Sequence, residues 1–218
     1  MRHLDCEAMS AAEERIAEVV RPTAFQRDAQ LVEAARHGDA AARSAIFERH
    51  ARHVARVLVR VLGSDAEVAD LVHDVFTQAL RDLGRLSEPA ALKGWLTAIS
   101  VNTARGHIRR RVRRRWLRFF APENLPEVEG PVADEATREA MRATYAILDA
   151  MRPGERIAFA LRFVDGMDLT EAASACGVSL ATIKRRLVRA EAAFVAMARE
   201  VPVLAGWLEG GTRWTATS

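Results

Sequence analysis

The segment LTEAASACGVSLATIKRRLVRA, Leu169 to Ala190, carries the most specific local pattern in the chain. Ala173 is small at a point where two helices must meet closely, and Gly177 permits the left-handed backbone of a tight turn. Ser179 can cap the next helix, because its side-chain oxygen accepts hydrogen bonds from backbone N–H groups of the first turn. This order of residues predicts a helix-turn-helix, a motif typical of DNA-binding proteins.

The helix expected after this turn has an apolar back and a basic front. Four apolar residues recur at helical spacing and should face the core: Ile183, Leu187, Ala190 and Phe194. The front includes Arg186 and the candidate DNA contacts, which are Ser179, Thr182, Lys184, Arg185, Val188 and Arg189. Arginine can bind guanine edges through two hydrogen bonds, and lysine and threonine can hold phosphates, so this face suits a major groove. The alternative is an ordinary helical hairpin whose charged side faces solvent.

The composition of the whole chain favours an all-α protein. Of its 218 residues 50% are hydrophobic and only 6% are aromatic, and the sequence shows no strand alternation, repeat or glycine-rich phosphate loop. The cysteines Cys6 and Cys176 form no CxxC motif, and there is no signal-peptide or membrane-span pattern, so we expect a soluble, cytoplasmic protein. We expect no catalytic residues, no cofactor and no metal, because His50 and His53 lack further zinc ligands nearby.

Helix signals are dense upstream of the helix-turn-helix. Apolar residues at helical spacing, with capping residues between them, predict successive helices between Asp28 and Gly38, between Asp39 and Gly63, between a Ser64–Glu67 capping box and Gly84, and from Pro89 onward. The last of these helices runs directly into a stretch that is rich in arginine.

Eight of the fourteen residues from Arg105 to Arg118 are arginines, although the formal net charge of the chain is only +3. Such clustering on a nearly neutral chain favours contact with nucleic acid over a general solubility role. Because the stretch continues a helix, its arginines should lie along phosphates and supply affinity, not sequence choice. A solvated basic face or a disordered basic arm is the alternative.

Taken together, the patterns predict two small helical domains joined by a flexible linker, the second containing the helix-turn-helix in a winged-helix-like arrangement. The expected division is an N-terminal extension at 1–27, a first domain at 28–117, an acidic, proline-containing linker at 118–134, a second domain at 135–200 and a tail at 201–218.

Several motifs, in this order, resemble the bacterial sigma factors, specifically the small two-domain extracytoplasmic-function (ECF) type. EVADLVHDVF, Glu67 to Phe76, resembles the helix by which the family binds the polymerase clamp. WLTAISVN, Trp95 to Asn102, resembles the helix that opens the minus-ten promoter element. Residues of the 153–166 segment, followed by Leu169 to Ala190, resemble the domain that binds the minus-thirty-five element. The resemblance covers residues 28–200 of the chain.

The resemblance implies a transcription initiation factor that binds core RNA polymerase and promoter DNA, with an anti-sigma factor as a candidate further partner. It implies polymerase binding by the residues Glu67, Asp70, Leu71, Asp74 and Gln78. It implies contact with the downstream promoter element by the residues Arg85, Leu86, Ser87, Asn102, Arg105, Arg109, Arg110 and Arg111. The loop from Arg85 to Ala91 is where family members capture a flipped-out base.

Three positions depart from the family pattern. Leu86 stands where an aromatic residue is frequent, Gly106 where aspartate is common, and Arg185 where serine is frequent. The first weakens any expectation of aromatic base stacking, and the last predicts an altered upstream preference. The main alternative function is a helix-turn-helix regulator that binds DNA without joining polymerase.

Overall fold

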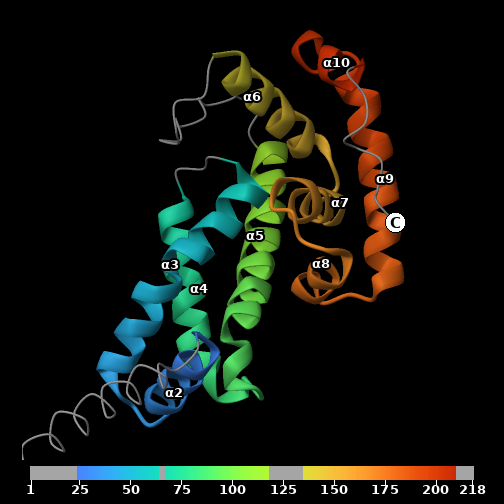
Figure 1. Ribbon diagram of the computed structural model, residues 1–218. Helices are drawn as coiled ribbons and strands as arrows, with labels where there is room; N and C mark the ends of the chain where they lie inside the picture. Colours follow the sequence, from blue (N-terminus) through green and yellow to red (C-terminus); the bar gives the residue numbers. More distant parts are fainter. Residues whose placement is uncertain (1–23, 64–66, 118–134, 210–218) are drawn as a thin grey trace, which may run out of the picture.

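The computed structural model describes residues 24–63, 67–117 and 135–209, and all regular secondary structure in these ranges is helical (Figure 1). The N-terminal half, 24–117, contains α2 (Ala24–Arg36), α3 (Ala40–Leu62), α4 (Val68–Asp82), the 3-10 turns η1 (Leu83–Arg85) and η2 (Pro89–Ala91), and α5 (Leu92–Leu117). The C-terminal half, 135–209, contains α6 (Glu135–Ala150), α7 (Pro153–Phe159), the π-turn η3 (Ala160–Val164), α8 (Leu169–Cys176), α9 (Leu180–Ala198) and α10 (Pro202–Glu209). The expectations for 1–23, most of the Ser64–Glu67 capping box, the linker and 210–218 lie outside the described residues.

The predicted helix boundaries are confirmed at most positions. The Asp39 side chain accepts hydrogen bonds from the backbone N–H groups of Ala41 and Ala42, at 2.8 and 3.2 Å. Gly63 ends α3 with a φ of 79°. Gly84, however, does not end a helix by a left-handed turn: α4 stops at Asp82, and Gly84 lies inside η1. The chain tightens into a 3-10 turn here, which needs no positive φ.

The helix α5 occupies the centre of the molecule. It contacts α3 and α4 of its own half and α7 and α8 of the C-terminal half, and Figure 1 shows it between the two groups. In its middle turns Leu96, Ser100, Val101 and Ala104 are all buried, so packing covers more than one side of α5, and Asn102 remains exposed on the other side. The buried Ser100 hydroxyl is satisfied because it donates to the Leu96 carbonyl at 2.8 Å.

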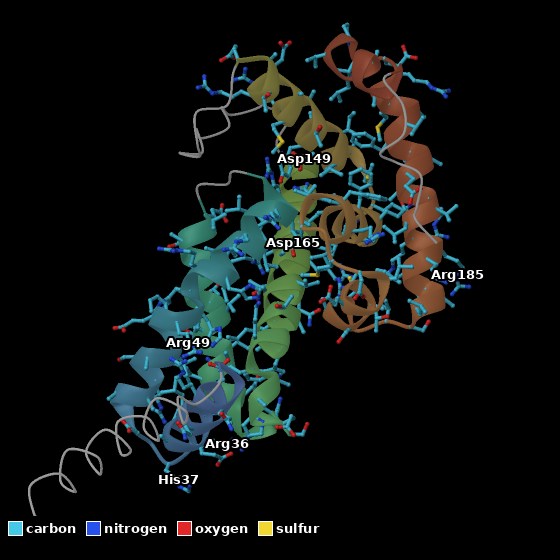
Figure 2. The ribbon with its side chains drawn as sticks, viewed as in Figure 1. Arg36, His37, Arg49, Asp149, Asp165 and Arg185 are labelled. Carbon is cyan, nitrogen blue, oxygen red and sulfur yellow. The ribbon has the colours of Figure 1, made fainter. Side chains whose placement is uncertain are left out.

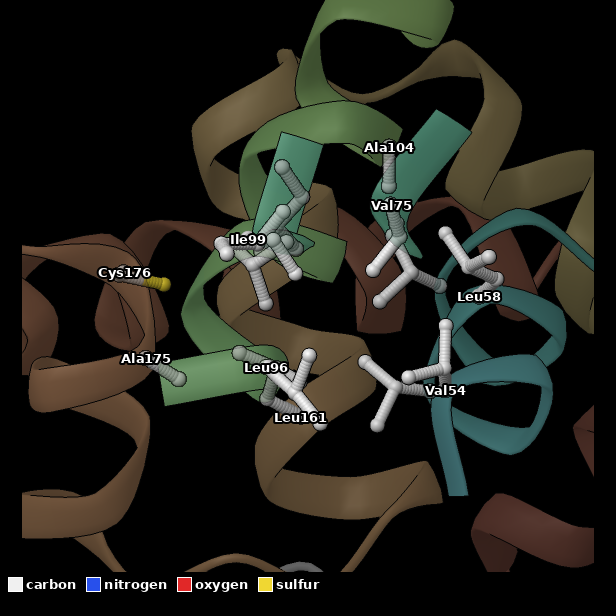
Figure 3. Close-up of a cluster of buried hydrophobic side chains, with 14 of the residues drawn as sticks. Val54, Leu58, Val75, Leu96, Ile99, Ala104, Leu161, Ala175 and Cys176 are labelled. Atoms are coloured by element: carbon white, nitrogen blue, oxygen red, sulfur yellow. The ribbon is translucent and has the colours of Figure 1, made fainter. Parts of the chain in front are cut away.

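One hydrophobic cluster therefore spans both halves. Figure 3 shows side chains of α3, α4 and α5 in the same cluster as Leu161, Ala175 and Cys176 of the C-terminal half. Sequence analysis predicted two domains and a linker, and nothing in the local patterns indicated that the domains would share a core. Burial of apolar area at about 25 cal/mol per Å² favours this packed arrangement.

The helix-turn-helix is confirmed in detail. Gly177 adopts a left-handed conformation with φ 62° and ψ 40°, and its N–H bonds back to the last turn of α8. The Ser179 hydroxyl accepts from the Thr182 N–H at 3.3 Å and so caps α9. A reciprocal capping box between Asp168 and Glu171 opens α8, and sequence analysis missed it.

A second hydrophobic cluster joins α6, α9 and α10. Phe159 and Phe194 stack in it with ring centroids 4.7 Å apart. Leu204 of α10 is buried in the same cluster, so the beginning of the segment assigned to the tail is a docked helix. Within the described ranges, no helix is long and apolar enough to cross a membrane.

Replacing Gly177 with alanine should destabilise the protein by about 1–2 kcal/mol, because a Cβ is strained in the left-handed region. Chemical denaturation measures this loss. Gly84→Ala is the matched control: no atom lies within 4 Å of a Cβ at Gly84, and its φ is not positive, so its stability should change little. Equal losses in the two variants would contradict the role given to the Gly177 turn.

Candidate nucleic-acid interface

The basic side of α9 faces solvent, as predicted. Its candidate DNA contacts are exposed or, for Thr182 alone, half-buried: Ser179, Thr182, Lys184, Arg185, Val188 and Arg189. The apolar side of α9, with Ile183 and Leu187, is buried. Figure 2 shows Arg185 on the outer side of α9, away from α5. Val188 is 68% exposed, which is unusual for an aliphatic side chain and leaves it available to a thymine methyl group.

Two arginines of α9 contact α7, namely Arg186 and Arg189, and Arg189 is also one of the candidate DNA contacts. The Arg189 Nε donates to the Glu155 carboxylate at 3.0 Å, and Glu155 is buried. The half-buried Arg186 lies over Gly154, where an added Cβ would be 3.4 Å from the guanidinium carbon. Arg186 therefore packs against the scaffold, although sequence analysis placed it on the basic front.

A second basic surface runs along α5 and the loop before it. Arg109, Arg110 and Asn102 are exposed on α5, and Arg85 and Ser87 are exposed in the loop. The Leu86 side chain is only 5% exposed, so it anchors the loop in the core and is not available to a base in this arrangement.

The remaining predicted downstream contacts, Arg105 and Arg111, are held by the C-terminal half. Arg105 donates to the Asn102 side-chain oxygen at 2.8 Å and to the Cys176 carbonyl at 3.2 Å. Arg111 lies 3.6 Å from the Asp149 carboxylate. Burial raises the pKa of the Cys176 thiol, which keeps it neutral and unsuited to nucleophilic chemistry.

The acidic surface lies on α4. Glu67, Asp70, Asp74 and Gln78 are exposed, whereas Leu71 is 3% exposed and belongs to the core. A Glu67 oxygen is 3.3 Å from Nδ1 of the buried His107. Asp70 and Asp74 are one helical turn apart, a like-charge spacing that costs a helix a few tenths of a kcal/mol (~0.2–0.5). The acidic and basic surfaces occupy different elements of the N-terminal half.

The guanidinium of Arg156 closes the contact between the two halves. It is 3% exposed, and it donates through Nε to the Val61 carbonyl and through Nη2 to the Leu62 carbonyl, each at 3.0 Å. Nη1 pairs with the Asp149 carboxylate, which also faces Arg111. Burial lowers the pKa of Arg156, and the Asp149 carboxylate opposes that shift. A cation from the C-terminal half thus caps the carbonyl end of α3.

Further contacts tighten the same junction. The Tyr145 hydroxyl donates to the Arg60 carbonyl at 3.2 Å, and Arg60 forms an ion pair with Asp165. Figure 2 shows Asp149 and Asp165 on the inner side of the C-terminal half, toward α5. A Cβ at Gly63 would lie 3.1 Å from the Tyr145 ring, so only glycine fits here without a shift. Arg156 lies in the 153–166 segment that carries part of the family resemblance, but sequence analysis did not identify the role of its side chain.

The two histidines considered for a metal have structural partners. His50 Nε2 lies 3.2 Å from the Asp28 carboxylate. His53 Nε2 lies 2.8 Å from the Thr97 hydroxyl, which itself donates to the Lys93 carbonyl, so His53 is the donor. Burial lowers the pKa of His53 to about 4, and the ring is neutral at pH 7. Among the described residues, no group of three or more His, Cys, Asp or Glu side chains is placed to hold a metal.

Comparison with known proteins gives consistent matches in both halves. The family model for Sigma-70 region 2 matches residues 46–114, and the model for Sigma-70 region 4 matches residues 141–194. The RNA polymerase sigma-H factor of Pseudomonas aeruginosa is 25% identical over 177 residues, which cover 77% of this chain and 92% of that protein. The ECF RNA polymerase sigma-E factor of Escherichia coli is 27% identical over 175 residues, which cover 76% of this chain and 91% of that protein.

Two solved structures have a similar fold. CnrH in complex with the cytosolic domain of CnrY aligns with a TM-score of 0.53 and 23% identity, over 85% of this chain and 99% of that chain. The sigma factor RpoE in complex with the anti-sigma factor NepR from Bartonella quintana aligns with a TM-score of 0.53 and 20% identity, over 72% of this chain and 95% of that chain.

Proposed function

Because this chain belongs to the sigma-70 family, as an ECF-type transcription initiation factor that binds RNA polymerase, we propose that it divides this task among three surfaces. The acidic side of α4 docks on core polymerase. The 85–91 loop and the exposed side of α5 contact the melted downstream promoter element. The exposed side of α9 holds the upstream element as duplex DNA. The separation of these charged surfaces on different helices supports the proposal.

The protein acts by binding and catalyses no reaction. It favours promoter opening because its N-terminal half binds the unpaired downstream strand more tightly than the closed duplex. Unstacking a base costs a few kcal/mol (~2–4), so hydrogen bonds or packing between the displaced base and the 85–91 loop must offset this free energy. Its partners are then core polymerase and the chromosome, so it works in the cytoplasm. Binding to these partners requires no cofactor.

The arrangement of the two halves bears on this role. Arg105 and Arg111 must leave the Cys176 carbonyl and the Asp149 carboxylate before they can reach phosphates. Engagement with polymerase and DNA therefore involves separation of α5 from α7 and α8. An anti-sigma factor that binds either half would compete with this process. The solved neighbours CnrH and RpoE are each bound to another protein, and RpoE is bound to an anti-sigma factor, which supports such a partner here.

Binding to purified core polymerase tests the proposal against the alternative of a regulator that never joins polymerase. We expect a stable complex on size-exclusion chromatography and specific transcription when promoter DNA is added. A protein that binds duplex DNA through α9 but forms no complex with core enzyme would support the alternative instead.

Lys184→Ala and Arg185→Ala should each weaken binding to the upstream element by roughly 5- to 150-fold, the equivalent of about 1–3 kcal/mol per base contact. Both side chains are exposed, so stability should be unchanged. Footprinting or anisotropy with duplex DNA measures the affinity. Arg199→Ala, exposed just past the other end of α9, is the control. An unchanged base preference in both variants would contradict the role of α9 in recognition of the upstream element.

Neutralising Arg109 and Arg110 together, as Arg109→Gln/Arg110→Gln, should weaken binding about equally on different promoters. Each phosphate contact contributes about 0.7 on single strands to about 0.9 on duplex to the slope of log affinity against log salt. The slope should therefore fall by about 1.4–1.8 in magnitude when affinity is titrated against salt. Loss of binding on some promoters and not others would contradict a phosphate role.

A further inference from the structure

The helix α2 lies outside the segment that matches the sigma family model, yet it supports the loop before α5. The model match begins at residue 46, whereas α2 spans Ala24–Arg36. α2 contacts both η1 and η2, the turns at either end of the loop that presents Ser87. α2 belongs to none of the three proposed surfaces, so the proposed function gives it no role in promoter recognition.

The helix α2 is fixed on α3 by a buried polar contact and by apolar packing. Asp28 is 5% exposed, and its carboxylate is 2.9 Å from Arg49 Nε and 3.2 Å from His50 Nε2. Val32 and Ala35 are 0% and 1% exposed in the core. α2 therefore provides a rigid base on which its last residue can position another segment.

That last residue, Arg36, uses its guanidinium as a fork. Its Nε donates to the Leu83 carbonyl at 3.3 Å, and its Nη2 donates to the Leu86 carbonyl. Its Nη1 pairs with Glu33 at 2.6 Å, one turn back on α2. Figure 2 shows Arg36 at the end of α2. The Leu83 carbonyl lies two residues before Arg85, and the Leu86 carbonyl directly precedes Ser87, so the two contacts fix the backbone that carries both side chains.

The loop is held at other points as well. The Leu86 side chain is buried beneath it, and the Glu88 carboxylate caps η2 through the Ala90 N–H at 3.3 Å. The side chains of Arg85 and Ser87 on either side of Leu86 are exposed to solvent, as is that of Glu88. A loop fixed in this way loses less conformational entropy when a base binds, which raises affinity and sharpens the choice of base.

We propose that Arg36 is a positioning residue for downstream-element recognition, which sets the shape of the 85–88 loop by holding the Leu83 and Leu86 carbonyls. This inference rests on the proposed function of the loop. Arg36 need not touch DNA. A planar fork is required, since a lysine ammonium cannot hold both carbonyls in the same geometry.

The test uses wild-type, Arg36→Lys and Arg36→Ala proteins, each assembled with core polymerase. Anisotropy measures binding to single-stranded oligonucleotides that carry the downstream element of a mapped promoter, with each base replaced in turn. We expect both variants to lose about tenfold of the discrimination at one or two adjacent positions. Affinity for a scrambled oligonucleotide and for core polymerase should not change.

Glu33→Ala is the matched control, because it removes the exposed partner of Arg36 and leaves both carbonyl contacts in place. It should keep the wild-type base preference. Thermal denaturation identifies any loss of stability. If Arg36→Ala does not fold, Arg36→Lys still tests the inference, because it keeps the positive charge and removes only the planar fork.

The outcomes separate this inference from the proposed function. If Arg36→Lys keeps the wild-type base preference, or lowers affinity equally for every oligonucleotide, Arg36 is only a structural cap and the inference is wrong. If the wild-type complex shows no base preference on the single strand, the proposed function of the loop fails and the inference fails with it.

Discussion

Reversing the charge of Asp70 and Asp74 together, as Asp70→Lys/Asp74→Lys, should reduce affinity for core polymerase by more than about 100-fold and abolish specific transcription. Both carboxylates are exposed on α4 and one turn apart. The repulsion between the two carboxylates does not stabilise the free protein, whereas a basic surface on a partner would be attracted to both of them. Like charges placed across an interface cost several kcal/mol (~3–5), which sets the size of the effect.

The reversal should leave the protein folded. Two lysines one turn apart repel each other about as much as two aspartates. Asp70 lies in the first turn of α4, where a lysine opposes the helix dipole, so the free energy of unfolding should fall by about 1 kcal/mol. Titration of labelled protein with core polymerase measures the affinity. Glu139→Lys/Glu200→Lys makes the same charge change on exposed residues of the C-terminal half and serves as the control. Normal transcription by the Asp70/Asp74 variant would exclude α4 as the docking surface.

Replacing Arg156 with methionine should lower the free energy of unfolding by about 3 kcal/mol. Methionine fills a similar volume, but it leaves the Val61 and Leu62 carbonyls without their donor and Asp149 without its closest cation. Removal of one partner from a buried charged network leaves uncompensated polar groups, which is costly in the protein interior.

Chemical denaturation measures the loss, and hydrogen exchange at the end of α3 locates it. Arg152→Met is the control, because the Arg152 side chain is 83% exposed and lies 4.0 Å from Glu155. A variant as stable as wild type would mean that the junction between the halves contributes little to the folded state.

The elements that sequence analysis predicted well are those with short-range causes. The Asp39 cap, the Gly177 turn and the Ser179 cap each involve residues within a few positions of one another, so the sequence alone contains the signal. The inside and outside faces of α9 follow from helical spacing in the same way. The prediction that Gly84 ends its helix was wrong. Glycine at a helix end usually takes a left-handed conformation, whereas this chain continues into a 3-10 turn.

The contacts that sequence analysis missed are long-range. Arg36 holds carbonyls about 50 residues away, and Arg156 holds carbonyls more than 90 residues away. No periodic pattern encodes such pairs. On α5 the residues Ser100 and Val101 are also buried, and the apolar spacing that predicted this helix did not indicate that a second layer packs on it.

The same limit affects the candidate site. The basic stretch from Arg105 onward was predicted to lie along phosphates, but the pattern could not show that Arg105 and Arg111 contact the C-terminal half. Leu71 and Leu86 were named as contact residues because of their positions in the family resemblance, yet both are core side chains that support the exposed residues beside them. Burial, not charge, separates the residues that are available to a partner from those that are not.

Mapping of transcript starts tests the central claim most directly. Purified full-length protein is combined with core RNA polymerase and fragmented genomic DNA, and the 5′ ends of the transcripts are sequenced. We predict a set of starts, absent with core enzyme alone, that share two upstream sequence elements at a fixed separation and disappear with Asp70→Lys/Asp74→Lys. A pattern of starts identical to that of core enzyme alone, from a protein that still binds duplex DNA, would contradict the account.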